Sequence, residues 1–356
     1  MDLNELRKHI DQIDEELVAL LNKRAEIVVQ IGRLKSGSGT PIYAADREKA
    51  VLQKIRKANK GPLPDRTLLA IYRELMSGSF LLEKPLRIAY LGPEGSYSHL
   101  AAIGKFGSSV EYEPVVDIRG VFEEVTREHA DFGLVPIENS VHGGVIDTLD
   151  ALIEVDVQIC AEINRAIHHN LLANCPLEAV ERVYSKPEVF TQCQRWLNET
   201  GLSRKTEAVA STSRAAELAR DEPRSAAIGS TLAADLYHLK VICANIEDNA
   251  NNVTRFFVIG RQAAKPTGDD KSSVVFTTRD EPGALVSVLQ AFQSVGVNMS
   301  FIQSRPSKKR NWEYYFFVDI KGHQADPAVQ KAVEAARPHC LRLNVLGSYP
   351  RAQEVI

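Results

Sequence analysis

The chain has 356 residues, of which 44% are hydrophobic and 25% are charged, and this length predicts about two or three globular domains. A formal net charge of −3 argues against binding of nucleic acid through an overall basic surface and favours small anions held by local cations. No stretch approaches the ~18 consecutive apolar residues of a membrane span, and the first residues lack the apolar run of a signal peptide. We therefore expect a cytoplasmic protein that binds neither nucleic acid nor membrane.

The cysteines and histidines form no pattern typical of a metal or redox site. Five cysteines are widely spaced and form no CxxC pair, so we expect reduced thiols and no zinc. His168 and His169 are adjacent in an apolar run, where strand neighbours face opposite sides, so we expect one of them to be a packed core histidine. His142 in "NSVHGG" and this histidine pair could serve acid–base chemistry or hold a metal, and we do not expect them to bind a metal. The sequence predicts neither a metal nor a cofactor.

Residues 1–83 show helical patterns only. From Leu6 to Leu34 apolar residues recur at alternating spacings of four and three, which predicts a first helix from Leu3 to Lys35, roughly 50 Å long. A second helix is expected to begin near Asp46 and a third to run from Pro64 to Glu83. Because so long a first helix cannot be covered by two short partners, we predict an intertwined dimer of three-helix chains.

The apolar stripe of the first helix is interrupted by cations. Arg24 replaces an apolar residue in the repeat, and Lys35 follows eleven residues later, about three helical turns away and on nearly the same face. Such cations can be covered by glutamates of a neighbouring helix, or they can line a pocket for an anion. Polar residues on the packing faces of the other two helices favour the pocket.

This segment resembles the all-helical chorismate mutase domain through "LNELRKHID", "NKRAEIVVQIGRLK", "DREKA" and "MSGSFLLE". The resemblance implies that Arg24 and Arg7 hold the two carboxylates of chorismate, with Arg7 supplied by the partner subunit. It also implies that Lys35 and Glu83 flank the ether oxygen, where charge grows during the Claisen rearrangement. The implied catalytic residues of this domain are Arg7, Arg24, Lys35, Arg47, Glu48, Ser79 and Glu83.

Residues 86–261 alternate short apolar strands, small polar turns and helices, which predicts a doubly wound α/β domain in two lobes with its ligand at the carboxyl ends of strands. Several of these turns carry hydroxyls, and each hydroxyl is explained by helix capping alone. Together they can also form an anion site, because helix N-termini present unpaired N–H groups. These hydroxyls belong to Ser96, Ser140, Ser185, Ser211, Thr212, Ser213 and Ser230.

Five stretches in this order resemble prephenate dehydratase: "GPEGSYSHLAA", "VPIENS", "YSKPEVFTQC", "AAIGS" and "NVTRFFVIG". The resemblance implies that prephenate loses carboxylate and its ring hydroxyl to give phenylpyruvate. It assigns Thr254 as the hydrogen-bond donor to the departing hydroxyl. The implied substrate contacts are Glu138, Asn139, Ser140, Ser185, Gln192 and Arg255.

Residues 272–350 follow the order β-α-β-β-α-β, which predicts a ferredoxin-like α+β domain. The stretches "PGALVSVLQAF" and "VNMSFIQSRP" resemble the ACT regulatory domain, which implies phenylalanine as an effector bound between paired subunits. A domain that serves dimerisation alone is the alternative. The implied effector-binding residues are Gly283, Ala284, Leu285, Val286, Asn298, Gln303, Ser304, Arg305 and Pro306.

Together these features predict a bifunctional enzyme that turns chorismate into prephenate and then phenylpyruvate, with phenylalanine as inhibitor, working as a homodimer or as a tetramer of paired dimers. Three alternatives stay open at this point. The helical segment can be a weak or regulatory mutase attached to a working dehydratase, or the whole chain can be a non-catalytic amino-acid sensor. A DNA-binding regulator is a third possibility, which the negative net charge disfavours.

Overall fold

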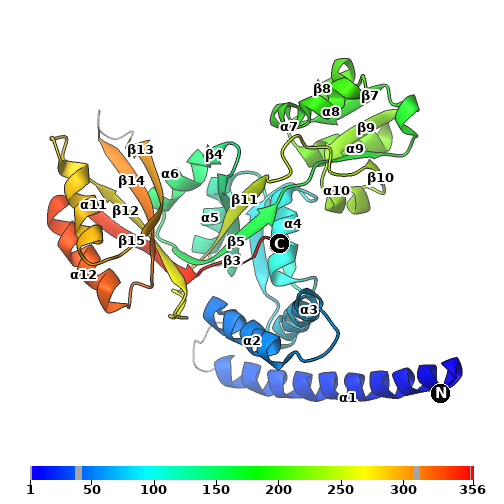
Figure 1. The fold of residues 1–356 in the computed structure, drawn as a ribbon, viewed down its shortest axis with the longest axis horizontal. Helices are drawn as coiled ribbons and strands as arrows, with labels where there is room; N and C mark the ends of the chain where they lie inside the picture. Colours follow the sequence, from blue (N-terminus) through cyan, green and yellow to red (C-terminus); the bar gives the residue numbers. More distant parts are fainter. Residues whose placement is uncertain (1, 37–41, 308–312, 353) are drawn as a thin grey trace. The chain divides into compact units, whose positions relative to one another are not determined.

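The computed structural model describes residues 2–36, 42–307, 313–352 and 354–356. Figure 1 shows the fold as a ribbon coloured along the sequence. The chain forms two compact units. The first unit consists of Met1–Ala44, Leu52–Leu86 and Phe106–Glu111; the second consists of Ala45–Val51, Arg87–Lys105 and Tyr112–Ile356. The second helix, α2 (Ala45–Ala58), therefore contributes its first two turns to the second unit.

The first unit is built on α1 (Leu3–Ser36) and α3 (Asp65–Glu83). The helix α1 matches the predicted one to within a residue, and Pro64 is the N-cap of α3. Gly32 allows α3 to approach closely, because a Cβ there would lie 3.1 Å from Cγ of Glu83. Most of the apolar stripe of α1 stays exposed, namely Leu6, Ile10, Ile13, Leu17, Leu20, Ile27, Ile31 and Leu34.

The second unit begins with a lobe that we call the first lobe. Its sheet has the order β2-β1-β3-β11-β5, with β4 paired to β3. The strands β1 and β3 are parallel, whereas β11 runs antiparallel to both its neighbours. The strands are β1 (Arg87–Leu91), β2 (Glu111–Val115), β3 (Phe132–Asn139), β4 (Gly143–Gly144), β5 (Gln158–Ala166) and β11 (Val253–Gly260). The helices are α4 (Tyr97–Phe106), α5 (Ile118–Thr126) and α6 (Ile146–Glu154).

The second lobe is inserted between β5 and β11, so the chain crosses from one lobe to the other twice. The two crossing strands lie side by side in the first lobe and must run in opposite directions, which explains why its sheet is mixed. The sheet of the second lobe has the order β10-β6-β9-β7-β8. Its strands are β6 (Asn170–Ala173), β7 (Arg182–Ser185), β8 (Thr206–Ala208), β9 (Ser225–Gly229) and β10 (Lys240–Cys243). Its helices are α7 (Pro187–Gln192), α8 (Gln194–Glu199), α9 (Thr212–Asp221) and α10 (Thr231–Leu236).

The C-terminal domain has a four-stranded antiparallel sheet in the order β13-β14-β12-β15, which confirms the ferredoxin-like prediction. Its elements are β12 (Asp270–Thr277), α11 (Ala284–Ser294), β13 (Met299–Pro306), β14 (Tyr314–Lys321), α12 (Pro327–Ala336) and β15 (Arg342–Pro350). The two helices cover one face of the sheet around Phe276 and Phe292. Short 3-10 turns lie at Leu177–Ala179, Ser203–Lys205 and Arg337–His339.

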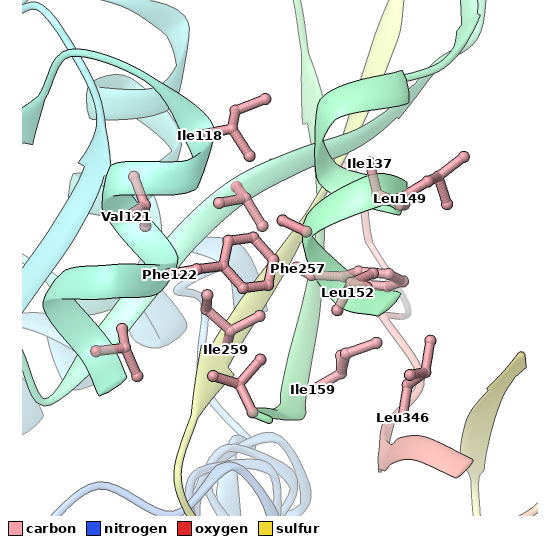
Figure 2. Close-up of a cluster of buried hydrophobic side chains, with 14 of the residues drawn as sticks. Ile118, Val121, Phe122, Ile137, Leu149, Leu152, Ile159, Phe257, Ile259 and Leu346 are labelled. Atoms are coloured by element: carbon pink, nitrogen blue, oxygen red, sulfur yellow. The ribbon is translucent and has the colours of Figure 1, made fainter. Parts of the chain in front are cut away.

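The other face of the C-terminal sheet shares a hydrophobic core with the first lobe. Phe122 of α5, Ile159 of β5 and Phe257 of β11 belong to the same buried cluster as Phe317 and Leu346 of the C-terminal sheet; Figure 2 shows several of these side chains. The backbones of the two domains also meet directly, because a Cβ on Gly347 would overlap the backbone of Ile159. The C-terminal domain and the first lobe are therefore packed as one body.

Two features are absent from the described residues, a membrane-spanning helix and a cluster of metal ligands. None of the described helices is both long and apolar enough to cross a bilayer. No group of three or more histidine, cysteine, aspartate or glutamate side chains in the described part of the chain is arranged to hold a metal ion. All five cysteines are free thiols.

Candidate active sites

The interface of α1 and α3 brings together four of the predicted site residues. Nη1 of Arg24 donates a hydrogen bond of 2.8 Å to Oγ of the buried Ser79. Further along the interface, Nζ of Lys35 pairs with the Glu83 carboxylate at 2.9 Å and donates to the carbonyl of Ile42 at 3.3 Å. The two cations of the α1 stripe, Arg24 and Lys35, thus meet polar groups of α3, whereas the apolar residues of the stripe stay exposed.

The other predicted residues of this domain are Arg7, Arg47 and Glu48. Arg7 is exposed on α1, seventeen residues before Arg24, which is about 25 Å along a helix. It therefore cannot reach the Arg24–Ser79 pair of its own chain. Arg47 and Glu48 belong to the second unit, where Arg47 is exposed and Glu48 pairs with Lys105 at 2.6 Å.

A second constellation is centred on Thr254, at the start of β11. The register of β11 and β3 places Thr254 opposite Asn139. Nδ2 of Asn139 donates both to Oγ1 of Thr254, at 2.9 Å, and to Oδ1 of Asn252, at 2.8 Å. Oδ1 of Asn139 accepts the backbone N–H groups of Val141 and His142. Because these backbone groups can only donate, they fix which way the Asn139 amide points.

The second lobe contributes Gln192, the last residue of α7. Oε1 of Gln192 accepts a hydrogen bond of 3.0 Å from Nδ2 of Asn252, and Nε2 of Gln192 lies 2.6 Å from Nε2 of His142. Ser140 ties the turn after β3 to β11, because its Oγ donates to the Asn251 carbonyl and accepts the N–H of Val253. Predicted residues of both lobes are thus joined in one polar network.

Two predicted substrate contacts, Glu138 and Arg255, lie on the opposite face of the sheet from Thr254. The expectation that Arg255 stands beside Thr254 in the site is wrong, because successive strand residues point to opposite faces. Glu138 follows Arg255 to that face, with its carboxylate 3.9 Å from the guanidinium. The Arg255 guanidinium instead meets the buried carboxylates of Glu162, at 2.7 Å, and Asp319, at 2.5 Å.

The environment of Arg255 joins the first lobe to the C-terminal domain. Glu162 lies on β5, whereas Asp319 and Tyr349 lie on β14 and β15. Nη2 of Arg255 donates to the Tyr349 hydroxyl at 3.0 Å. Burial acts to lower the pKa of Arg255, but Tyr349, Asp319 and Glu162 outweigh it and raise this pKa above its ordinary value. Arg255 is a charged structural link directly after Thr254.

Ser185 is a further predicted substrate contact in the second lobe. This residue is fully buried at the end of β7, and its hydroxyl donates to the Ile228 carbonyl at 2.8 Å. This bond ties β7 to the neighbouring strand β9, and the role of Ser185 as a substrate contact stays a prediction.

Several of the hydroxyls in the polar turns cap helices, and one of the described hydroxyls, on Ser213, is buried without a hydrogen-bond partner. Oγ of Ser211 and Oγ of Ser230 accept backbone N–H groups as the N-caps of α9 and α10. Ser230 also donates to the Gly95 carbonyl at 2.8 Å, which joins the lobes. In the part of the chain that the structure describes, Oγ of the buried Ser213 has no hydrogen-bond partner. Oγ of Ser96 likewise accepts the N–H of His99 at the start of α4, so capping explains three of these turns, and Ser213 is suited to an anion.

Three residues of the Thr254 network are missing from the sequence prediction: Asn252, His169 and Tyr97. Asn252 precedes Thr254 by two positions, so the period-two rule of strands could have found it. His169 is buried, as expected for one member of the histidine pair, but it contacts Gln192 as well. Tyr97 reaches His169 from α4. The sequence shows no signal for these last two contacts.

The predicted effector residues of the C-terminal domain divide into two groups. Ala284 and Leu285 line a hollow of about 190 Å³ at the start of α11, together with Arg279 and Tyr314. Gly283, directly before them, has a φ of +86°, which favours glycine. Val286 is exposed, and the Asn298 carbonyl accepts the N–H of Lys321.

The second group lies on β13, whose side chains alternate between two faces. Arg305 forms two hydrogen bonds of 2.9 Å with the Asp150 carboxylate on α6. A Cβ on Gly144 would overlap the carboxamide of Gln303. Ser304 and Pro306 are exposed on the other face. The predicted effector residues on β13 are thus divided between two faces of the strand. Gln303 and Arg305 are turned toward the first lobe.

Comparisons with known proteins identify all three parts of the chain. A model of chorismate mutase type II matches residues 6–84, a model of prephenate dehydratase matches residues 88–264, and a model of the ACT domain matches residues 272–338. A bifunctional chorismate mutase/prephenate dehydratase of Aquifex aeolicus is 44% identical over 356 residues, covering 99% of this chain and 98% of that protein.

Solved structures match the part of the chain after the helices. A prephenate dehydratase from Arthrobacter aurescens, in complex with L-Phe, is 33% identical with a TM-score of 0.69, covering 75% of this chain and 90% of that one. GqqA, described as a novel type of quorum quenching acylases, is 27% identical with a TM-score of 0.70, covering 75% of this chain and 98% of that one. The order of the three matched domains and the near-complete coverage by the Aquifex protein show that this chain belongs to the bifunctional chorismate mutase/prephenate dehydratases.

Proposed function

We propose that the mutase reaction takes place around Arg24, Lys35, Ser79 and Glu83. Chorismate is a dicarboxylate whose rearrangement needs a compact conformer and stabilisation of charge on the ether oxygen, and no covalent catalysis. Arg24 suits bidentate capture of a carboxylate. Lys35 supplies the positive charge for the ether oxygen, and Glu83 holds Lys35 in place until substrate arrives. Arg47 and Glu48 complete our proposed set of mutase residues.

A second copy of the chain completes this site. Arg7 lies too far along α1 to serve its own Arg24, and a stripe of exposed leucines and isoleucines leads from one to the other. An exposed stripe of this length favours burial against another α1. We therefore propose an intertwined homodimer in which Arg7 of each chain serves the partner's site.

Subunit mixing tests this arrangement. Arg7→Ala and Arg24→Ala homodimers are both expected to lose mutase activity, because each site lacks one arginine. A mixed dimer has one intact site, so an equimolar mixture reassembled from unfolded chains should recover about a quarter of wild-type activity. No recovery beyond the sum of the two variants would contradict the shared site.

We propose that dehydration takes place at Thr254. The observation that carries this proposal is that Asn139 donates to Oγ1 of Thr254, which leaves the hydroxyl hydrogen of Thr254 available to the substrate. In the fragmentation of prephenate, the carboxylate leaves as CO2, the ring becomes aromatic, and the departing hydroxide must accept a proton. Thr254 stabilises that leaving group by hydrogen bonding, while Asn139, Ser140 and Gln192 surround the substrate.

The two activities are tested together by supplying chorismate alone. The purified protein is expected to form phenylpyruvate, which requires both sites. Accumulation of prephenate would show that the mutase site is active and would contradict the assignment of dehydration to Thr254. Unchanged chorismate would remove the mutase assignment, and prephenate supplied directly would then test the second site separately.

Phenylalanine is our proposed effector, bound at the hollow beside Gly283 and Ala284, with Ser304 and Pro306 presented to a second copy. The Arthrobacter relative was solved in complex with L-Phe, which supports this ligand. The free thiols of all five cysteines favour the cytoplasm as the compartment.

The Arg305–Asp150 pair is expected to carry inhibition from the ACT domain to the dehydratase. Arg305→Gln should raise the phenylalanine concentration for half-inhibition about fivefold or more, while calorimetry still detects phenylalanine binding. Asp150→Asn, which removes the same contact from the other side, should give the same loss. Arg351→Gln is the control, because its ion pair with Asp269 does not involve α6. Unchanged inhibition in both Arg305 and Asp150 variants would contradict this coupling.

A further inference from the structure

A chain of hydrogen bonds extends from the Thr254 site into the interior of the second unit. Oε1 of Gln192 lies 2.5 Å from Nε2 of His169, and Nδ1 of His169 lies 2.6 Å from the Tyr97 hydroxyl. The Tyr97 hydroxyl also lies 2.9 Å from the His168 carbonyl. Asn139, Asn252 and Gln192 link this chain to Oγ1 of Thr254. These hydrogen bonds thus connect the Thr254 site with side chains that do not face it.

The direction of each bond follows from the backbone N–H groups of Val141 and His142. They donate to Oδ1 of Asn139, so its Nδ2 must donate to Asn252. Oδ1 of Asn252 accepts that bond, and its Nδ2 then donates to Oε1 of Gln192. An oxygen at Oε1 requires His169 to present a proton on Nε2.

The remaining bonds follow in the same way. With its proton on Nε2, a neutral His169 has a free electron pair on Nδ1, which accepts the hydroxyl hydrogen of Tyr97. Nε2 of Gln192 donates to Nε2 of His142 on the other side. Every side-chain contact in the chain of hydrogen bonds then has one donor and one acceptor, and the His168 carbonyl competes with Nδ1 of His169 as a second acceptor for the Tyr97 hydrogen. The amide of Gln192 is left with its NH2 group turned toward His142 and its oxygen turned inward.

The surroundings of His169 and Tyr97 keep both groups in these protonation states. Burial lowers the pKa of His169, although its bond to Gln192 and the charge of Glu247 oppose the shift, so the imidazole is neutral. Burial, with Cys193 and Glu247, raises the pKa of the Tyr97 hydroxyl well above its ordinary value, so it remains a donor. Glu247 also accepts the backbone N–H of His169 at 2.8 Å, which holds the residue in place.

We propose that His169 and Tyr97 are positioning residues of the dehydratase site, which hold the Gln192 carboxamide with its NH2 group toward the substrate. The proposal rests on the assignment of that site to Thr254 and Gln192. Neither residue is expected to touch prephenate. His169 acts by donating to Oε1 of Gln192. Tyr97 donates to Nδ1 of His169 and thereby favours the His169 tautomer that carries its proton on Nε2.

The first test compares substitutions at His169. His169→Leu removes the donor and should lower kcat/KM for prephenate roughly tenfold to 100-fold, with mutase activity unchanged in the same preparation. His169→Gln returns a donor near the position of Nε2 and should recover most of the loss. His168→Gln is the matched control, since that side chain is exposed and pairs with Glu247; it should behave as the wild type. Wild-type kcat/KM in His169→Leu would overturn the proposal.

A double-mutant cycle separates positioning from a general structural effect. If His169 acts through Gln192, the His169→Leu substitution should cause no further loss in a Gln192→Ala background. Losses that multiply would overturn the proposal. The ¹⁵N shifts of the His169 imidazole give a third readout: the wild type should show the proton on Nε2, and Tyr97→Phe should shift the population toward the other tautomer. A proton on Nδ1 in the wild type would also overturn it.

These outcomes are distinct from failure of the proposed site. If Thr254→Val leaves dehydration intact, the site assignment itself is wrong, whatever the His169 variants do. If Thr254→Val abolishes dehydration while His169→Leu does not reduce it, only the positioning role is wrong.

Discussion

Replacing Arg255 with glutamine is expected to destabilise the second unit by about 3–5 kcal/mol, which makes it the most damaging single substitution we predict for stability. Arg255 lies between two carboxylates that are almost fully buried, with side-chain exposures of 0% for Glu162 and 4% for Asp319. Glutamine leaves both charges in a region from which water is excluded. Lys271, at 3.1 Å from Glu162, is then left to compensate part of this charge.

The measurement is the thermal transition of the second unit by calorimetry, which should fall by on the order of 10 °C. Arg220→Gln is the control, since its ion pair with Asp221 is exposed and its loss should leave the transition unchanged. Adding Asp319→Asn to the Arg255 variant should restore part of the loss, because one of the uncompensated charges is removed. A transition unchanged by Arg255→Gln would show that the buried cluster does not stabilise the unit.

Thr254→Val is expected to lower kcat/KM for prephenate roughly 10²- to 10³-fold, the largest catalytic effect we predict for the dehydratase. Valine matches the shape of threonine but has no hydroxyl, so the leaving group loses its donor and Asn139 loses an acceptor. Initial rates with prephenate measure the effect. Mutase activity on chorismate should be unchanged, which shows that the chain is folded.

Two companion variants make this result specific. Thr254→Ser keeps the hydroxyl and should recover most of the activity. Thr200→Val removes a hydroxyl that bonds only to its own helix, at the Trp196 and Leu197 carbonyls, and should leave dehydration unchanged. Wild-type turnover of prephenate by Thr254→Val would contradict our assignment of the site.

Most of the architecture can be predicted from the sequence, because helices and strands produce periodic patterns of apolar residues over short stretches. The alternating spacing along α1 predicts the helix, and Arg24 within that stripe predicts a polar pocket where α3 carries Ser79. The turn hydroxyls Ser211 and Ser230 predict helix starts, since an N-cap is a local requirement. In each case the physical cause acts over a few residues.

The predicted site is less complete because its contacts depend on tertiary placement. The resemblance groups Arg255 with its sequence neighbour Thr254, although strand alternation separates adjacent side chains. Ser185 shares its residue type with true capping serines, and only its neighbours in the sheet show that it bonds to Ile228. His169 is recognisable as a core residue, but its contact with Gln192 joins elements that are 23 positions apart. No short sequence pattern encodes such a contact.

The alternation along β13 has a practical consequence for engineering. Gln303 and Arg305 point toward the dehydratase, whereas Ile302, Ser304 and Pro306 point outward. If phenylalanine binds as we propose, the residues that would recognise it and those that would transmit its binding are encoded at alternate positions of a single strand. On that proposal, changes at odd-numbered residues should give an enzyme that resists inhibition but still binds phenylalanine. Changes at even-numbered residues can instead retune the choice of effector while the connection to catalysis is kept.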